Sequence, residues 1–170
     1  MPDTKSWTWV LARACPECGL DVGALRRDEL VPRLAATVQA WSEVLRGRDL
    51  GVRPAPEVWS PLEYGCHVRD VYRVNDRRLA QMLAEDDPGF ADWDQDATAE
   101  ADRYAEQDPA GVRAELLDAG GAYVARCAAV SGPQWQRPGR RSDGAAFTVE
   151  SSTRYVLHDP VHHLHDVGAG

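Results

Sequence analysis

The amino-acid sequence predicts an all-α protein built as a four-helix bundle. Four segments carry apolar residues at helical spacing, and two of these segments begin with a capping residue followed by proline, a pattern typical of helix starts. No series of alternating polar and apolar residues indicates a sheet. At 170 residues and 44% apolar composition, the chain is long enough to form one domain with a substantial core.

The chain divides into two predicted parts. Residues 1–27 form an irregular N-terminal segment that contains Cys15-Pro16-Glu17-Cys18-Gly19. Residues 28–170 form the helical bundle domain. The start of the chain does not resemble a signal peptide and no apolar run is long enough to cross a membrane, so we expect a cytoplasmic protein with no membrane partner. The net charge of -8 argues against nucleic acid as a partner.

The first predicted helix spans about 28–46, and Gly47 is a plausible stop. Its apolar residues recur at helical spacing: Leu30, Leu34, Val38, Trp41 and Leu45. A linker with two prolines, 52–58, separates it from the second helix, which begins at Ser60-Pro61-Leu62-Glu63 and runs to about Leu83.

The second half of the chain is predicted to contain a long connection followed by two more helices. Residues 84–107 are acidic and poor in apolar residues, which predicts a long connection of the kind that is often functional. Asp108-Pro109 begins a third helix that ends near Val130. A basic loop over 137–144 then leads to a fourth helix over about 149–167. The long connection allows a topology other than up-down-up-down.

Four of the five histidines lie between residues 158 and 165. His158 and His162 are four residues apart, so on a helix they lie one above the other and can reach one metal ion. His67, on the second helix, would complete a set of three ligands with positions left open for substrate. A solvated helix end, where protonated histidine suits the helix dipole, is the alternative interpretation of the C-terminal histidines.

A helical wheel started at Leu157 places Leu157, Val161 and Leu164 within roughly 40° of one direction, which we take as the buried face. His158 and His162 lie on one flank of it, together with His165. On this wheel the far side faces water: Asp159, His163 and Asp166. The wheel therefore predicts that His163 is solvated and takes no part in the site.

Carboxylates at helical spacing could orient the imidazoles of the metal ligands. Glu63 and Asp70 flank His67 at spacings of four and three residues, and Asp166 follows His162 by four. His165 is a further candidate for such a supporting role. Arg154, one turn before His158, is a candidate to bind an anionic substrate.

The pair Cys15 and Cys18 has the spacing of half a tetrahedral zinc site. Cys66 and Cys127 do not form a second such pair, so three interpretations stay open: a tight reduced turn, a redox-active pair, and a zinc half-site completed elsewhere in the chain or across a dimer.

The chain resembles the DinB-like metalloproteins, which include bacillithiol- and mycothiol-dependent transferases. The resemblance rests on Trp59-Ser60-Pro61-Leu62-Glu63-Tyr64-Gly65-Cys66-His67-Val68-Arg69-Asp70 and on His158-Asp159-Pro160-Val161-His162-His163, about 90 residues apart. It implies a bundle with an unusual crossover, often a homodimer, and one divalent ion, most often zinc or nickel. In that pattern the ligands correspond to His67, His158 and His162.

The resemblance further implies a metal-dependent enzyme that uses a low-molecular-weight thiol as co-substrate for S-transfer or isomerisation of small electrophiles. Lys5 is the single lysine against eighteen arginines, a composition typical of a high-GC genome, which favours mycothiol as the thiol. Two alternatives stay open: a non-catalytic metal-binding protein of a stress response, and a dimeric scaffold.

Overall fold

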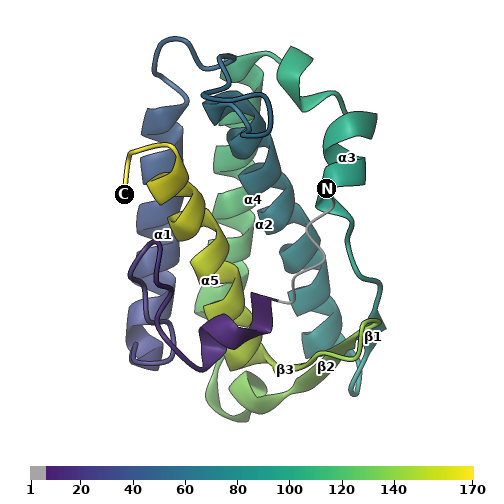
Figure 1. The fold of residues 1–170 in the computed structure, drawn as a ribbon. Helices are drawn as coiled ribbons and strands as arrows, with labels where there is room; N and C mark the ends of the chain where they lie inside the picture. Colours follow the sequence, from purple (N-terminus) through teal and green to yellow (C-terminus); the bar gives the residue numbers. More distant parts are fainter. Residues whose placement is uncertain (1–6) are drawn as a thin grey trace.

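The computed structural model describes residues 7–170, and four long helices form a bundle in it (Figure 1). They are α1 (Arg27–Val44), α2 (Pro61–Ala84), α4 (Pro109–Ala129) and α5 (Val149–Asp166). Each helix lies within two residues of its predicted bounds at both ends. The predicted all-α four-helix bundle is confirmed.

Two of the helix starts form as the sequence predicts. The Ser60 hydroxyl accepts a hydrogen bond from the Glu63 backbone N–H, and the Glu63 carboxylate accepts one from the Ser60 N–H at 2.9 Å. Asp108 accepts from the Gly111 N–H at 2.8 Å. These caps satisfy donors that the first turn of a helix leaves free. The first cap fixes where α2 begins and therefore which of its faces carries His67.

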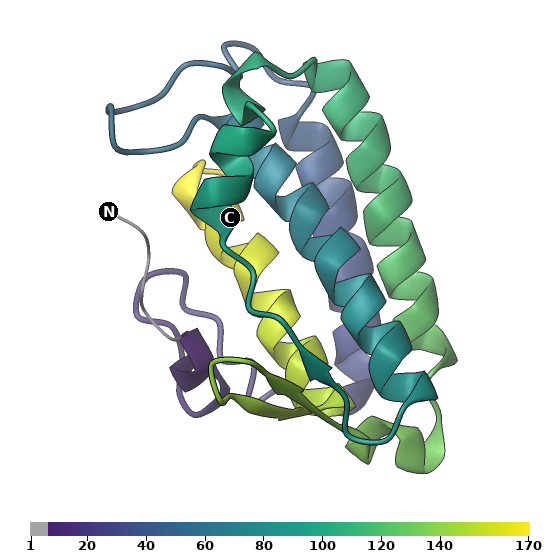
Figure 2. The ribbon, with the colours of Figure 1, turned by 90° about the vertical axis from the view of Figure 1, so that its right-hand side faces the viewer.

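The core lies between the four long helices, and α2 packs against both α4 and α5 (Figure 2). The helices over 61–84 and 149–166 are therefore spatial neighbours, as predicted. The largest fully buried side chains are Trp41, Tyr72, Tyr104, Tyr123, Leu30, Leu34, Met82, Leu116 and Leu157. Trp41 also donates from Nε1 to the Pro160 carbonyl oxygen at 2.9 Å, which fixes α5 against α1.

The sequence did not predict a small three-stranded sheet at one end of the bundle. It contains β1 (Gly89–Phe90), β2 (Pro138–Arg141) and β3 (Ala146–Thr148), with β1 parallel and β3 antiparallel to β2. Strands of two to four residues are too short to show an alternating pattern, and their pairing is non-local. A Cβ at Gly139 would lie 2.8 Å from Met82 Cγ, so the close approach of β2 to α2 requires glycine there.

The connection between α2 and α4 is ordered rather than extended. After β1 it contains the short helix α3 (Gln95–Ala101) and a 3₁₀ turn, η2 (Tyr104–Glu106). A second 3₁₀ turn, η3 (Gly132–Gln136), follows α4. The connection runs along the same side of the bundle as α2 and α5 (Figure 2).

The N-terminal segment crosses the outside of α5 (Figures 1 and 2). It begins with the 3₁₀ turn η1 (Trp7–Leu11) and is otherwise irregular, as predicted; the first six residues of the segment lie outside the described residues. Val10 and Val22 are fully buried against the bundle. Within the part of the chain that the structure describes, no helix has the length and apolar character needed to cross a membrane.

Candidate metal centre

The structure divides the three predicted ligands between two groups of side chains. His67 lies with Asp159 and His163, and we call this group the α2–α5 cluster. His158 and His162 lie with Cys15 and Cys18, and we call this group the N-terminal cluster. In each cluster the potential ligand atoms lie within 4.8 Å of one another; among the described residues, His67, His158 and His162 together do not form such a group.

The α2–α5 cluster joins two helices through one carboxylate. His67 Nε2 lies 3.2 Å from Asp159 Oδ1 and 3.3 Å from Asp159 Oδ2. His163 Nε2 lies 3.8 Å from Asp159 Oδ1. Asp159 and His163 are four residues apart on α5, so they use the same helical spacing that was predicted for His158 and His162.

Charge and burial act in opposite directions in this cluster. Burial alone would raise the pKa of Asp159, but His67 and His163 hold it well below its usual range. Burial would lower the pKa of His163, but Asp159 and a hydrogen bond to Asp166 raise it overall. Asp159 is therefore a carboxylate at neutral pH, the form that binds a cation.

The side chains of the α2–α5 cluster fit a divalent ion. Nitrogen and oxygen ligands at about 2.0–2.2 Å from one ion lie about 2.8–3.6 Å apart, depending on the coordination angle. The Nε2–Oδ1 separation of His67 and Asp159 is 3.2 Å, within this range, and that of His163 and Asp159 is 3.8 Å, slightly above it. His163 Nδ1 lies 2.8 Å from Asp166 Oδ2, which turns Nε2 towards the cluster as in carboxylate–histidine–metal arrangements. His67 Nδ1 is buried and has no hydrogen-bond partner among residues 7–170.

Aromatic rings surround the α2–α5 cluster. Trp93 stacks on His67 with ring centroids 5.5 Å apart and planes at 3°, and Trp59 packs on the same imidazole at 5.6 Å. Tyr64 packs on His163 at 4.7 Å. Trp93 belongs to the connection between α2 and α4, and its Nε1 donates to Thr98 Oγ1 at 2.8 Å. The connection therefore covers His67, which excludes water from one side of the cluster.

A cavity of about 100 Å³ opens beside the two clusters. Its lining consists of Trp7, Gln95, Tyr155, His158, Asp159, His162 and His163. Asp159 and His163 are thus accessible to a small molecule, whereas His67 is fully buried behind them.

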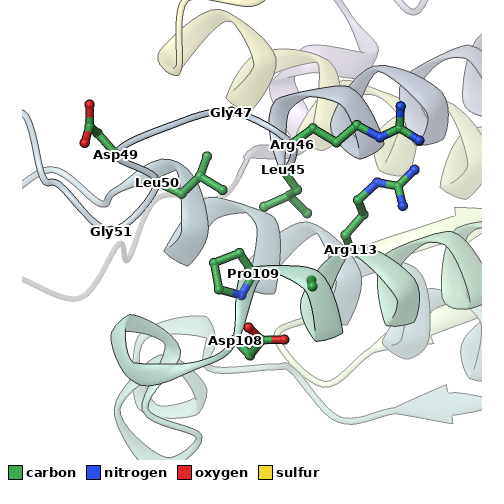
Figure 3. Close-up of a pocket in the computed structure, with 10 residues that line it drawn as sticks. Leu45, Arg46, Gly47, Asp49, Leu50, Gly51, Asp108, Pro109 and Arg113 are labelled. Carbon is green, nitrogen blue, oxygen red and sulfur yellow. The ribbon is translucent and has the colours of Figure 1, made fainter.

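A second hollow, of about 610 Å³, lies between the end of α1, the loop after it and the start of α4 (Figure 3). Its lining has charged side chains, among them Asp49, Asp108 and Arg113, but no histidine or cysteine. Both groups of potential metal ligands found among the described residues instead include side chains of α5.

In the N-terminal cluster each cysteine faces one histidine. Cys15 Sγ lies 3.6 Å from His162 Nδ1, and Cys18 Sγ lies 3.7 Å from His158 Nε2. Neither cysteine forms a disulfide. Burial raises the pKa of the Cys18 thiol, which is the opposite of the lowered pKa of reactive redox pairs. Burial and the neighbouring His162 lower the pKa of His158 to about 4, so this imidazole is neutral at neutral pH.

The prediction that His163 and Asp159 face water is wrong, and the reason is the choice of buried face. Val161 is only partly buried, whereas Pro160 is buried. Using Pro160 in place of Val161 turns the buried direction by roughly 30° towards Asp159 and His163. Asp159 and His163 then lie at the edge facing α2, and His158 and His162 face outwards under the N-terminal segment.

The predicted supporting residues have mixed outcomes. Glu63 binds Arg53 and Ser60, and Asp70 binds Arg69, Arg73 and Tyr104; neither carboxylate has a hydrogen bond to His67 among the described residues. Asp166 does face the site: it binds His163 and lies 3.8 Å from His162 Nε2.

His165 and Arg154 lie away from both clusters' ligand atoms. His165 is exposed near the end of α5. The guanidinium of Arg154, predicted to bind a substrate, instead donates to the carbonyl oxygens of Val22 and Leu25 and to Glu150. Its interactions in the structure attach the N-terminal segment to α5.

Comparison with known proteins identifies the fold family. A model of the DinB superfamily matches residues 30–167. The chain belongs to the DinB superfamily. The DinB match begins after Cys15 and Cys18, so the cysteine pair lies outside it, whereas both histidine-containing stretches lie within it.

A solved structure agrees with this assignment. YfiT from Bacillus subtilis, described as a probable metal-dependent hydrolase with an unusual four-helix bundle topology, superposes with a TM-score of 0.75 at 21% sequence identity. The match covers 84% of this chain and 85% of YfiT. At this identity the likeness establishes the fold alone. No relative was found among curated proteins.

Proposed function

We propose that this chain is a metal-dependent enzyme that binds one divalent ion at His67, Asp159 and His163. The observation that carries the proposal is the arrangement of two imidazoles and one ionised carboxylate at ligand separations, with Asp159 and His163 lining a cavity. Three protein ligands leave coordination positions open, which is characteristic of catalytic rather than structural metal sites. Zinc and nickel both suit such ligands.

Of the three ligands predicted from the sequence, the proposed set includes His67. On α5 it has Asp159 and His163 in place of His158 and His162, a shift of one residue. It rests on the separations around Asp159 and on Asp166, which binds His163 Nδ1 and so presents Nε2 to the cluster. The predicted set of His67, His158 and His162 would require ligand atoms from both clusters.

We further propose that the nucleophile is a low-molecular-weight thiol, mycothiol in particular, and that the reaction is S-transfer or isomerisation of a small electrophile. A divalent ion at this cluster would lower the pKa of a thiol that reaches it and so supply a nucleophile at neutral pH. The family resemblance is the basis for the thiol. The aromatic side chains of Trp7 and Tyr155 belong to the cavity lining and would suit an electrophile with an apolar part.

Hydrolysis is the second candidate, and the carboxylate favours it. Two histidines and one carboxylate are the ligand set of several zinc hydrolases, in which water is the nucleophile. Asp159 also compensates part of the charge of the ion, which weakens the attraction for a thiolate that three neutral imidazoles would exert. The description of YfiT as a probable metal-dependent hydrolase agrees with this candidate.

A single set of assays separates the candidates. The metal-loaded chain is incubated with mycothiol and a panel of electrophiles, and separately with esters and amides in the absence of thiol. Conjugation that disappears in Asp159→Asn and His163→Ala, but persists in the exposed control His165→Ala, supports the transferase. Hydrolysis without conjugation refutes the thiol. Stoichiometric metal binding without either reaction supports the non-catalytic alternative.

A further inference from the structure

We propose that Cys15, Cys18, His158 and His162 form a second, closed zinc site that fastens the N-terminal segment to α5. The four ligand atoms lie within 4.8 Å of one another and come from two parts of the chain more than 130 residues apart in sequence. A four-ligand set of two thiolates and two imidazoles is characteristic of structural zinc. This site is distinct from the α2–α5 cluster, because the two clusters share no ligand.

The separations match those of a tetrahedral zinc site. Sulfur at about 2.3 Å and nitrogen at about 2.0–2.1 Å from one zinc ion lie about 3.6 Å apart in a tetrahedron. The separation of Cys15 Sγ and His162 Nδ1 is 3.6 Å, and that of Cys18 Sγ and His158 Nε2 is 3.7 Å. The other pairs of ligand atoms in the cluster lie within 4.8 Å of one another. Two thiolates would also balance the charge of the ion, so the closed site would be neutral overall.

The local backbone brings both thiols to one side of the segment. The Gly19 N–H donates to the Cys15 carbonyl oxygen, and the Cys15 N–H donates to the Leu20 carbonyl oxygen, both at 2.9 Å. Gly19 has a φ of +75°, a conformation that glycine adopts without strain. This tight turn between Cys15 and Leu20 holds the two sulfur atoms in fixed positions opposite α5.

The imidazoles are oriented for binding as well. His162 presents Nδ1 to Cys15, while its Nε2 lies 3.2 Å from the Glu17 carboxylate. Glu17 belongs to the same Cys-Pro-Glu-Cys turn, so the segment supplies both the sulfur ligand and the partner of the second ring nitrogen. Trp7 packs on His158 and His162, with ring centroids 5.8 and 5.3 Å away.

Burial is what distinguishes this cluster from a coincidental grouping on the surface. Cys15, His158 and His162 are buried, although both histidines face away from the bundle core. The N-terminal segment covers that face of α5 (Figure 2). Val10 and Val22 are fully buried, and Leu11, Leu20 and Leu25 pack against the core only in part. A metal crosslink would add to these contacts at the turn between Cys15 and Cys18.

The test is metal analysis of the purified full chain and of variants, prepared without chelator. In a His67→Ala background, which removes the α2–α5 cluster, we expect one zinc ion per chain. Adding Cys15→Ser and Cys18→Ser should reduce zinc to below one tenth of that value, and His162→Ala should do the same. Cys127→Ser, a buried cysteine on α4, is the matched control and should retain the ion.

Cobalt substitution identifies the ligands. The His67→Ala chain loaded with Co²⁺ should show the strong visible bands of tetrahedral cobalt and a thiolate-to-cobalt charge-transfer band, and both should vanish when Cys15 and Cys18 are replaced. X-ray absorption of the zinc-loaded His67→Ala chain should show two sulfur and two nitrogen neighbours around the zinc ion. All four proposed ligands are intact in this chain, so the result does not depend on whether a variant lacking one of these cysteines or histidines folds.

Two results would overturn the proposal. The first result is that replacing Cys15 and Cys18 changes neither the zinc content nor the cobalt spectrum. The other is a metal-free chain whose two thiols form a disulfide under mild oxidation while the segment stays protected from proteolysis, which would identify a redox pair. Neither result would bear on metal binding by His67, Asp159 and His163, so the two proposals fail separately.

Discussion

The two clusters on α5 differ in what the rest of the chain adds to the same helical motif. Each uses two side chains four residues apart, and the two pairs are offset by a single residue: Asp159 with His163, and His158 with His162. The α2–α5 cluster gains one buried imidazole from α2. The N-terminal cluster gains two thiols from an irregular segment outside the bundle.

The difference in ligands leads to a difference in chemistry. A set of three ligands beside a cavity leaves positions on an ion for a reactant, whereas a set of four that includes two thiolates closes the coordination shell. The two clusters are also adjacent, since the rings of His162 and His163 have centroids 5.7 Å apart. A step of one residue along α5, about 100° around the helix axis, therefore separates the proposed reactive site from the proposed structural site.

The sharpest test of this comparison is a pair of alanine substitutions at neighbouring positions. We expect His163→Ala to lower activity by at least about 100-fold and to remove the ion of the α2–α5 cluster, because it deletes a ligand. His162→Ala should leave that ion bound. The measurements are the metal content and the activity of the two variants. If His162→Ala loses the ion and the activity while His163→Ala keeps both, the ligand set predicted from the sequence is correct instead.

Removing the ion of the N-terminal cluster should act on the segment rather than on the bundle. We expect Cys15→Ser with Cys18→Ser to expose residues 12–26 to limited proteolysis while the helical circular-dichroism signal is retained, because the four-helix core does not depend on the segment. Activity should fall less than in His163→Ala, through loss of the cavity wall that Trp7 provides. Loss of most helical signal would show that the segment is part of the folding core.

The carboxylates that orient the imidazoles allow a finer comparison. Asp166→Asn should weaken metal binding at the α2–α5 cluster by about 10- to 100-fold, because it removes the partner of His163 Nδ1. Glu17→Gln should affect the N-terminal cluster instead, and by less, since Glu17 is largely exposed. Competition titrations with a chelating dye measure both affinities. Equal effects of each variant on both ions would contradict the separation into two sites.

The bundle itself can be weakened without touching either cluster. A Cβ at Gly120 would lie 2.5 Å from Val38 Cγ2, so Gly120→Ala should destabilise the fold by about 1–3 kcal/mol. At the adjacent Gly121 a Cβ meets nothing within 4 Å, and Gly121→Ala should stabilise by about 0.5–1 kcal/mol. Denaturant unfolding measures the change in the free energy of unfolding for both variants. In the absence of denaturant, both folded variants should keep their full metal content. A loss of metal in native Gly120→Ala would mean that the clusters depend on α1–α4 packing.

Much of the fold could be predicted because its signals are local. Ser60-Pro61 and Asp108-Pro109 specify helix starts through hydrogen bonds within one turn, and the apolar spacing specifies which segments can pack. The small sheet could not be predicted, since Gly89–Phe90 pairs with a strand about fifty residues away and is too short to carry a pattern. Trp93 likewise had no signal that would place it on His67.

The sequence predicted which helices carry the histidines, but not which side of α5 faces α2. The sequence indicated histidines on the second and fourth helices, and a cysteine pair with zinc-like spacing. It could not decide the direction in which α5 is buried, because Val161 and Pro160 are both plausible core residues and each gives a different wheel. The buried side of Pro160 depends on Trp41 and α1, which lie more than a hundred residues earlier.

The sequence by itself therefore determined the four helices, their capped starts and the residue types available for metal binding, because hydrogen bonds within a turn and helical periodicity are properties of neighbouring residues. Only the tertiary structure decided which of those residues meet. Asp159 reaches His67 and His162 reaches Cys15 because packing against α1 and α2 fixes the rotation of α5, and a rotation about the helix axis leaves every local interaction unchanged.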